Sequence, residues 1–276
     1  MGYYNPPRPQ KWNFTPNSKE PYRMSRTGLE NFVRCPRCFY IDKRLGVGQP
    51  PTPSFTLNSA VDYLLKKEFD VYRAKGETHP LLEKYGVKAR PVSHAKLDEW
   101  RETFKGIGFV HQPTNIHFYG GIDDLWINDD EELIVVDYKA TSKDGKITLD
   151  DEWKESYKRQ LEIYQWLLRQ NGFKVSTTGY FVYCNALKDR IAFDGKLEFD
   201  IELIPYEGDD SWIEAKLIEA HKCLMQDQIP DWNKDCDYCK YRKITQSLEA
   251  KSKAEKQKVT EGKAGDKPPF DEGKLF

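Results

Sequence analysis

The stretch of sequence that most constrains the fold is residues 120–141, which read GGIDDLWINDDEELIVVDYKAT. Two short apolar runs in it, 122–127 and 133–136, flank the polar segment 128–132. Apolar runs of this length on either side of a polar turn predict a β-hairpin. Aspartates stand near the outer end of each run, so such a hairpin brings carboxylates together at its open end.

The register of the hairpin decides which carboxylates meet. If Ile127 pairs with Leu133 across the five-residue loop, antiparallel counting places Asp123 opposite Asp137. A register shifted by one residue places Asp124 opposite Asp137 instead. The sequence therefore predicts a pair of facing carboxylates and leaves the identity of the first one open.

Facing carboxylates imply a cation. Directly opposed residues on one face of a sheet have Cβ atoms ~4.5–5.5 Å apart, and like charges at that separation are destabilising. Oxygen ligands suit Mg²⁺ or Mn²⁺, which typically take one or two carboxylates together with water and substrate phosphate. Strand alternation puts Lys139 on the same face as Asp137, where a lysine can hold and polarise an attacking water. This chemistry is phosphodiester hydrolysis, and the alternative interpretation is an acidic, solvated hairpin.

Other segments join this hairpin in a recognisable combination. Residues 160–168 read QLEIYQWLL on a predicted helix, and residues 35–40 read CPRCFY. Together with the Gly-x-Ile-Asp and Asp-Tyr-Lys-Ala-Thr segments of the hairpin, they resemble the RecB-like branch of the PD-(D/E)XK nuclease superfamily. The resemblance covers roughly residues 25–245 and extends to CRISPR-adaptation and AddB-type exonucleases.

The resemblance implies roles for individual residues. Asp123 and Asp137 would be metal ligands, and Lys139 would be the catalytic lysine. Gln160 and Tyr164 would match the QxxxY motif, which in the family lies beside the active site and contacts DNA. Helical spacing places both of these side chains on one face, where core packing is the alternative role.

One position departs from the family pattern. Many RecB-like nucleases carry a histidine in a helix of the form G-x-x-V-H-x-L-L, and the matching stretch here is residues 58–65, NSAVDYLL. Asp62 occupies the place of that histidine. A carboxylate can still bind a hard metal ion, so Asp62 is a third candidate ligand, with a solvated helix residue as the alternative.

Four of the six cysteines form two CxxC pairs, Cys35/Cys38 and Cys236/Cys239. Reducing compartments disfavour disulfides, so this spacing predicts a metal site. Four thiolates suit Zn²⁺ or an iron–sulfur cluster. In the relatives one early and three late cysteines hold a [4Fe-4S] cluster, which favours iron–sulfur, whereas the paired arrangement equally suits zinc. Buried thiols are the third interpretation.

The overall composition excludes some classes of protein. The chain has 276 residues, 38% hydrophobic and 32% charged, with a formal net charge of -1. Near neutrality argues against a histone-like DNA coat, yet residues 1–50 carry nine basic against three acidic side chains, and residues 121–152 carry three against eleven. No apolar run approaches the ~20 residues of a membrane span, and residues 1–26 lack an apolar signal core, so we expect no membrane association and a cytoplasmic location.

The order of the predicted elements gives the domain organisation. We expect an irregular Pro-rich arm over 1–24, a nuclease-like domain over 25–245, and a disordered charged tail over 246–276 that could recruit a protein partner. The expected helices are 57–73, 152–169 and 211–225, and the expected strands after the hairpin are 178–183, 190–193 and 197–204.

This order predicts an α/β fold with a restriction-endonuclease-like core. A mixed central β-sheet would be flanked by helices, and a metal staple of four cysteines would join the chain ends. The expected activity is that of a Mg²⁺-dependent DNA nuclease, acting on single strands or duplex ends as an exonuclease in repair, recombination or defence. The alternative is a catalytically inactive nucleic-acid-binding module on the same fold.

Overall fold

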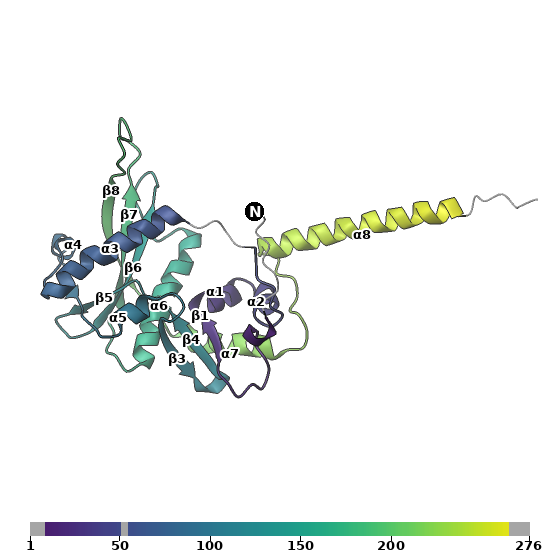
Figure 1. Ribbon diagram of the computed structural model, residues 1–276, viewed down its shortest axis with the longest axis horizontal. Coiled ribbons are helices and arrows are strands. Elements are labelled where there is room, and N and C mark those ends of the chain that lie inside the picture. Colours follow the sequence, from purple (N-terminus) through teal and green to yellow (C-terminus); the bar gives the residue numbers. More distant parts are fainter. Residues whose placement is uncertain (1–8, 51–54, 265–276) are drawn as a thin grey trace, which may run out of the picture.

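The predicted hairpin lies at the centre of a five-stranded mixed sheet (Figure 1). In spatial order its strands are β2 (Ala89–Pro91), β5 (Asp124–Asn128), β6 (Leu133–Thr141), β7 (Thr178–Ala186) and β8 (Phe199–Glu207). Strands β6 and β7 are parallel, and the other neighbours are antiparallel. Ile127 pairs with Leu133 across the β5–β6 turn, so the expected register is confirmed. The structure is a computed structural model and describes residues 9–50 and 55–264.

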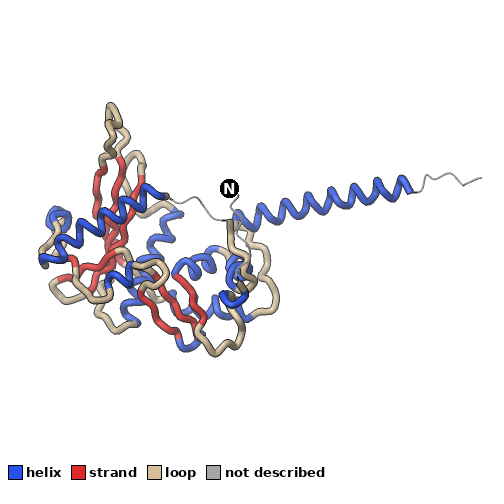
Figure 2. Tube along the Cα trace, in the orientation of Figure 1, coloured by secondary structure: helices blue, strands red, loops and turns tan. Residues whose placement is uncertain are grey.

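Helices cover both faces of this sheet, as Figure 2 shows. Helix α3 (Thr56–Lys75) packs on one face against Trp126, Ile134 and Val136. On the other face lies α6 (Glu155–Gln170), which follows the short 3₁₀ helix η3 (Glu152–Lys154). Strand residues alternate between the two cores because successive side chains on a strand point to opposite faces.

A second, three-stranded sheet extends the α6 side of the molecule. Its order is β1 (Tyr22–Ser25), β4 (Ile116–Gly120), β3 (Ile107–His111), with β1 parallel to β4. The expected irregular arm over 1–24 is therefore wrong at its end, because Tyr22 already pairs with Ile116 in this sheet. A four-residue strand with no long apolar run gives little local signal, and its partner lies far along the chain.

Small helices connect and cover the two sheets. The Ser25 Oγ accepts a hydrogen bond from the Gly28 N–H at 3.2 Å and so caps α1 (Arg26–Arg34). Pro36 begins the second helix at a position where its missing N–H costs nothing. The remaining helical segments are η1 (Gln10–Trp12), α1 (Arg26–Arg34), α2 (Pro36–Lys43), α4 (Pro80–Lys84), α5 (Leu97–Arg101), η2 (Gln112–Thr114) and α7 (Trp212–Met225).

The predicted helices 57–73, 152–169 and 211–225 all form, with ends within a few residues of those expected. The predicted strand 190–193 is wrong. Residues 187–198 form an irregular connection between β7 and β8, where Ile191 and Phe193 are exposed and lack a strand partner. The mixed α/β fold with a central sheet between helices, the class that was predicted, is confirmed.

The expected disordered tail from residue 246 is helical in the structure as far as Ala264. Helix α8 (Asp237–Ala264) extends away from the rest of the molecule in Figure 1. Beyond residue 246 its Lys, Glu, Ala and Gln residues are strong helix formers, which explains this part of the helix without tertiary packing. Residues 265–276 lie outside the described part of the chain. Over the described residues, no helix combines the length and apolar character needed to cross a membrane.

Candidate active site and cysteine cluster

Asp123 and Asp137 meet at the open end of the hairpin, as the register predicts. Asp137 lies on β6 and is fully buried, and Asp123 immediately precedes β5. The backbone N–H of Tyr138 donates to Asp123 Oδ2 at 3.0 Å, which fixes that carboxylate beside β6. Two carboxylates from adjacent strands therefore share one buried corner of the sheet.

Lys139 completes this corner from the same face of β6. Its ammonium forms an ion pair with Asp137 Oδ2 and lies 4.6 Å from the ring centroid of Tyr157 on α6. A buried ammonium held between a carboxylate and an aromatic face keeps its charge, and its pKa is raised because the attraction of Asp137 and Asp123 outweighs the effect of burial. The predicted lysine is thus a fixed positive charge beside the two carboxylates.

Gln160 and Tyr164 reach the same corner from α6. Gln160 Nε2 donates to Asp137 Oδ1 at 2.8 Å and to the Tyr164 hydroxyl at 3.2 Å. Gly120 makes room for the tyrosine, since a Cβ at that position would lie 2.7 Å from the ring. The QxxxY spacing therefore places one side chain on the carboxylate and the other against the strand that leads into Asp123.

The surroundings shift the pKa values of the two carboxylates in opposite directions. Burial, with a smaller contribution from Asp123, raises the pKa of Asp137 to about 7 against the opposing effect of Lys139. Burial also acts to raise the pKa of Asp123, but the charges of Lys66 and Lys139 outweigh it and lower that pKa. One carboxylate is thus ionised over the whole neutral range, and the other carries an unfavourable charge that a cation would stabilise.

The residues present fit a divalent metal ion. Asp137 Oδ2 is buried and accepts no hydrogen bond from any described residue, although the Lys139 ammonium pairs with it. A buried carboxylate beside a second carboxylate, with one oxygen contacted only by an ammonium, is a donor set for a hard cation. Asp123 and Asp137 would hold such an ion.

Asp62 lies close to this corner but not directly on it. Lys66 stands between the two, with its Nζ 2.8 Å from Asp62 Oδ2 and 3.4 Å from Asp123 Oδ1. Burial, together with the charge of Asp123, raises the pKa of Asp62. Lys66 was not among the predicted site residues, although its place one helical turn after Asp62 is the signal that could have found it. Whether Asp62 is a ligand stays a prediction, because Lys66 occupies the space between the carboxylates.

Asp124 points away from this corner and has a different environment. It is fully buried on the α3 side, where it accepts from the Tyr138 hydroxyl at 2.6 Å and from Arg101 Nη2 at 2.9 Å, and also pairs with Arg73. The observed register excludes the alternative in which Asp124 faces Asp137. Asp124 therefore neutralises a buried pair of arginines.

A cleft of about 430 Å³ opens onto the carboxylate corner. It is lined by Ser25, Arg26, Thr27, Asp62, Lys66, Arg101, Thr103, Phe104, Tyr119, Gly120, Gly121, Asp123, Gln160 and Tyr164. Basic side chains from three different elements, Arg26, Lys66 and Arg101, face the same space as the carboxylates. A cleft with acidic residues at its floor and basic residues along its walls suits a metal ion together with an anionic substrate.

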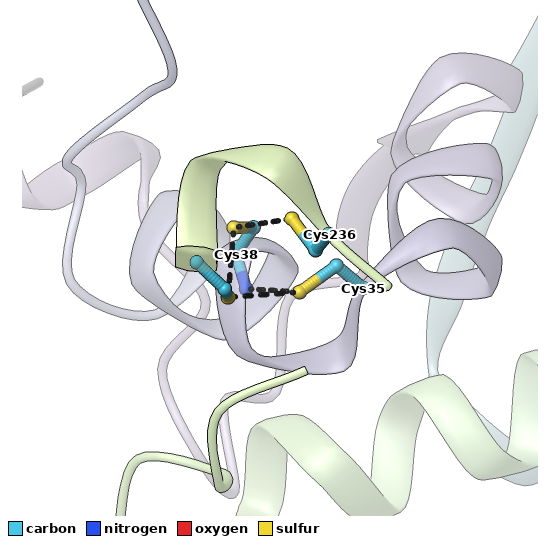
Figure 3. Close-up of side chains that lie close together, drawn as sticks. Cys35, Cys38 and Cys236 are labelled. Carbon is cyan, nitrogen blue, oxygen red and sulfur yellow. Dashed lines mark hydrogen bonds between the residues drawn. The ribbon is translucent and has the colours of Figure 1, made fainter. Parts of the chain in front are cut away.

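The two CxxC pairs come together at a second site, shown in Figure 3. The sulfur of Cys35 lies 3.6 Å from that of Cys239, and the sulfur of Cys38 lies 3.7 Å from Cys236 and 3.9 Å from Cys239. All four Sγ atoms lie within 4.8 Å of one another, and all four cysteines are free thiols. Zn–S bonds of about 2.3 Å in tetrahedral geometry place sulfurs roughly 3.8 Å apart, so the observed spacing fits one ion.

This cluster joins the N-terminal end of α2 to the beginning of α8. Burial raises the pKa of the Cys35 thiol to about 11 and also raises that of Cys38, whereas the hydrogen bonds around Cys236 lower its pKa against the effect of burial. Metal binding must therefore displace protons from at least two thiols. Within residues 9–50 and 55–264, these cysteines are the side chains that gather as a group of three or more candidate metal ligands.

Comparison with known proteins identified one family and a similar solved structure. A family model described as the PD-(D/E)XK nuclease superfamily matches residues 56–244. Among solved structures, one described as "Crystal structure of SSO0001" is similar, with 21% sequence identity over 83% of this chain and 87% of that chain and a TM-score of 0.39. No curated protein matches the chain. The family match includes Asp62, the whole hairpin, α6 and the second cysteine pair.

Proposed function

The chain belongs to the PD-(D/E)XK nuclease superfamily, and from this premise we propose that it is a divalent-metal-dependent deoxyribonuclease. Members of the superfamily are typically metal-dependent nucleases with DNA as their substrate. The observation that supports the proposal for this chain is the buried corner where Asp123, Asp137, Lys139 and Gln160 meet, with Asp123 and Gln160 lining a cleft that also holds basic side chains.

Each side chain has a defined task in phosphodiester hydrolysis. Asp123 and Asp137 would bind Mg²⁺ or Mn²⁺, which would supply Lewis-acid stabilisation of charge on the phosphate. Lys139 holds and polarises the attacking water, since its ammonium is fixed beside Asp137. Gln160 fixes the orientation of Asp137 through one carboxylate oxygen, while the other pairs with the Lys139 ammonium. Arg26 at the cleft wall attracts the phosphate backbone.

Replacing Lys139 tests this function. We expect Lys139→Ala to lower the rate of Mg²⁺-dependent DNA cleavage by about 100-fold or more, because a fixed charge at the reacting water is lost. The assay follows end-labelled single-stranded and duplex DNA with Mg²⁺, with Mn²⁺ and with EDTA. Lys188→Ala, in the exposed connection after β7, is the matched control and should cleave normally. Wild-type cleavage by Lys139→Ala that keeps its thermal stability would overturn the assignment.

The inactive binding module remains the competing function. It predicts DNA binding without divalent-dependent cleavage, and we do not favour it, because Lys139 and Gln160 both contact Asp137 in the arrangement that the nuclease proposal requires. Asp62 in place of the family's histidine is the one departure, and it lies within reach of the site through Lys66.

We extend the proposal to finer features that the sequence resemblance supports. These are membership of the RecB-like branch, exonuclease action from DNA ends, and a role in repair, recombination or defence in the cytoplasm. Degradation of linear but not circular DNA is the test of exonuclease action. A protein partner for the charged C-terminal region also belongs to this proposal, and the exposed Tyr241, Ile244 and Leu248 on α8 support it.

We also propose that the four cysteines hold a structural metal. The sulfur spacing favours one zinc ion, whereas the family resemblance favours a [4Fe-4S] cluster. A colourless preparation with one zinc per chain supports the first, and a brown preparation with iron and acid-labile sulfide supports the second. A metal-free preparation with normal stability would overturn both.

A further inference from the structure

An aromatic path leads from the catalytic corner to the surface. The ring of Tyr157 lies against the Lys139 ammonium, and the ring of Trp153 meets it edge-on with centroids 5.3 Å apart. Trp153 is 55% exposed, although tryptophan is among the most favourable residues to bury. Trp153 contacts Tyr157, which in turn contacts Lys139. A large exposed indole so close to the proposed catalytic lysine suggests that it binds substrate.

The buried residue next to Trp153 holds the indole in position. Trp153 belongs to the short helix η3, and the next residue, Lys154, is only 1% exposed. The Lys154 ammonium pairs with Asp151 at 2.9 Å, donates to the Thr148 carbonyl and lies 5.2 Å from the centroid of the Trp153 ring. A buried charge with several partners keeps this turn in one conformation, so the indole is presented as a rigid surface.

Trp153 lines a second cleft, of about 800 Å³, that continues the active-site cleft. The two clefts share Arg26 and Thr27. The second is lined by Arg26, Thr27, Glu30, Asn31, Arg34, Glu152, Trp153, Ser156, Arg159 and Asp237. Helix α1 spans its length, with Arg26 beside the active site and Arg34 at the far end.

The charges along this second cleft leave two arginines available. Arg159 is paired with Glu30, with both of its hydrogen bonds at 2.9 Å, and Asp237 is paired with Lys240. Arg26 and Arg34 form no ion pair with another described residue. Glu152 is the remaining acidic side chain of the lining. The cleft therefore offers these two guanidinium groups on one wall and an aromatic surface on the other.

From these features we propose that Trp153 stacks on an unpaired base of one DNA strand, whose backbone follows Arg26 and Arg34 along α1. The inference rests on the proposed nuclease function and specifies its substrate as single-stranded DNA or a single-stranded end. Base–aromatic stacking together with a basic groove is the general mode by which proteins hold single strands, because every unpaired base exposes a face. A blunt duplex keeps its base faces covered and cannot use the indole.

The decisive experiment measures binding of a fluorescein-labelled oligothymidylate by anisotropy, in buffer without added Mg²⁺ or Mn²⁺ and without chelator, so that no cleavage occurs and the cysteine site is not stripped. We expect Trp153→Ala to weaken binding by about 5-fold to 100-fold and Trp153→Phe to retain most of it. Trp12→Ala is the matched control, since Trp12 is 62% exposed and lies outside both clefts, and it should bind as the wild type does.

A strand with abasic sites separates stacking from a structural effect. Without bases the wild type and Trp153→Ala should bind equally, because the indole then has nothing to stack on. Equal weakening on thymidylate and abasic strands, an equal loss on blunt duplex, or unchanged binding by Trp153→Ala would each overturn the inference. Divalent-dependent cleavage by the wild type and its loss in Lys139→Ala are measured separately. The proposed stacking of single-stranded DNA on Trp153 can therefore be overturned while the nuclease assignment stands.

Discussion

Asp123 and Asp124 are adjacent residues with opposite tasks, and the pleat of the strand separates them. Asp123 faces the α6 side with Asp137, whereas Asp124 faces the α3 side with Arg73 and Arg101. Because alternate residues on a strand point to opposite faces, one carboxylate can serve chemistry while its neighbour serves stability.

Replacing each aspartate by asparagine should separate these tasks. Asp124→Asn leaves Arg73 and Arg101 with Asp70 as their remaining shared carboxylate and removes the fully buried one, so we expect the free energy of unfolding to fall by about 3 kcal/mol. Asp123→Asn should lose cleavage with a smaller loss of stability, since Lys66 and Lys139 keep Asp62 and Asp137 as partners. Chemical denaturation and the cleavage assay measure the two effects. Greater destabilisation by Asp123→Asn would contradict this division.

The raised pKa of Asp137 predicts how metal binding depends on pH. A group whose pKa is higher in the folded state contributes stability below its unfolded pKa of about 3.9, and that stability is lost as pH rises through about 7. The loss amounts to at most about 4 kcal/mol in metal-free protein. Mg²⁺ should therefore raise the melting temperature more at about pH 8 than at about pH 5.5, since protons compete with the ion.

Thermal melts with and without Mg²⁺ at the two pH values measure this effect. Asp137→Asn is the control, because an amide cannot titrate, and its small response to Mg²⁺ should not change with pH. A Mg²⁺ response that is larger at low pH would show that the metal does not bind the ionised form of Asp137.

Among the elements, the β5–β6 hairpin and α6 carry nearly all of the chemistry that could be predicted. Their signals are local: the five-residue polar turn between two apolar runs fixes the register, and Gln160 and Tyr164 are one helical turn apart. Lys66 and the arginine pair around Asp124 could not be found in this way. They reach the site from α3 and α5, and contacts between residues far apart in the sequence leave no local periodicity.

Helix α8 was predicted wrongly, since a segment expected to be disordered forms a helix. Its residues from 246 to 256 are exposed on every side, so its formation depends on intrinsic propensity alone. An isolated helix of this kind is marginally stable in water. The high helix propensity of its Lys, Glu, Ala and Gln residues outweighs the lack of apolar residues from which disorder was predicted.

Truncation after Thr245 should therefore leave the folded domain intact. We expect the free energy of unfolding to change by less than about 0.5 kcal/mol, because residues 246–256 are all exposed to solvent. Far-UV circular dichroism should lose helical signal while the thermal transition stays in place. A loss of more than about 2 kcal/mol would show that this region packs on the domain.

At the scale of the whole molecule, the cysteine cluster joins segments that are 204 residues apart in the sequence. The CxxC spacing predicted the cluster, but only the fold shows that both pairs reach one place. Closing a loop of this length constrains the unfolded chain by about 5 kcal/mol on a chain-entropy estimate. The metal would therefore contribute substantially to the stability of a domain whose central sheet separates two hydrophobic cores.

Removing one ligand tests this contribution. Cys35→Ser should lose bound metal and lower the free energy of unfolding by about 5 kcal/mol. Cys184→Ala is the control, because Cys184 lies in the core beneath α3 and should leave the metal content unchanged. Metal analysis and denaturation measure both properties. Full stability of metal-free Cys35→Ser would show that packing alone holds the ends together.

The cysteine cluster lies next to the second cleft, in which we propose that single-stranded DNA binds. Arg34 directly precedes Cys35, and Asp237, which lines the same cleft, directly follows Cys236. If binding of the DNA strand and binding of the metal both depend on this segment of the cleft, each must change the affinity for the other by the same factor, since coupling free energies are reciprocal. A DNA strand bound in the cleft should thus protect the thiolate-bound metal from a chelator. Loss of that metal should in turn weaken binding of the strand. The affinity for substrate would then depend on the supply of metal.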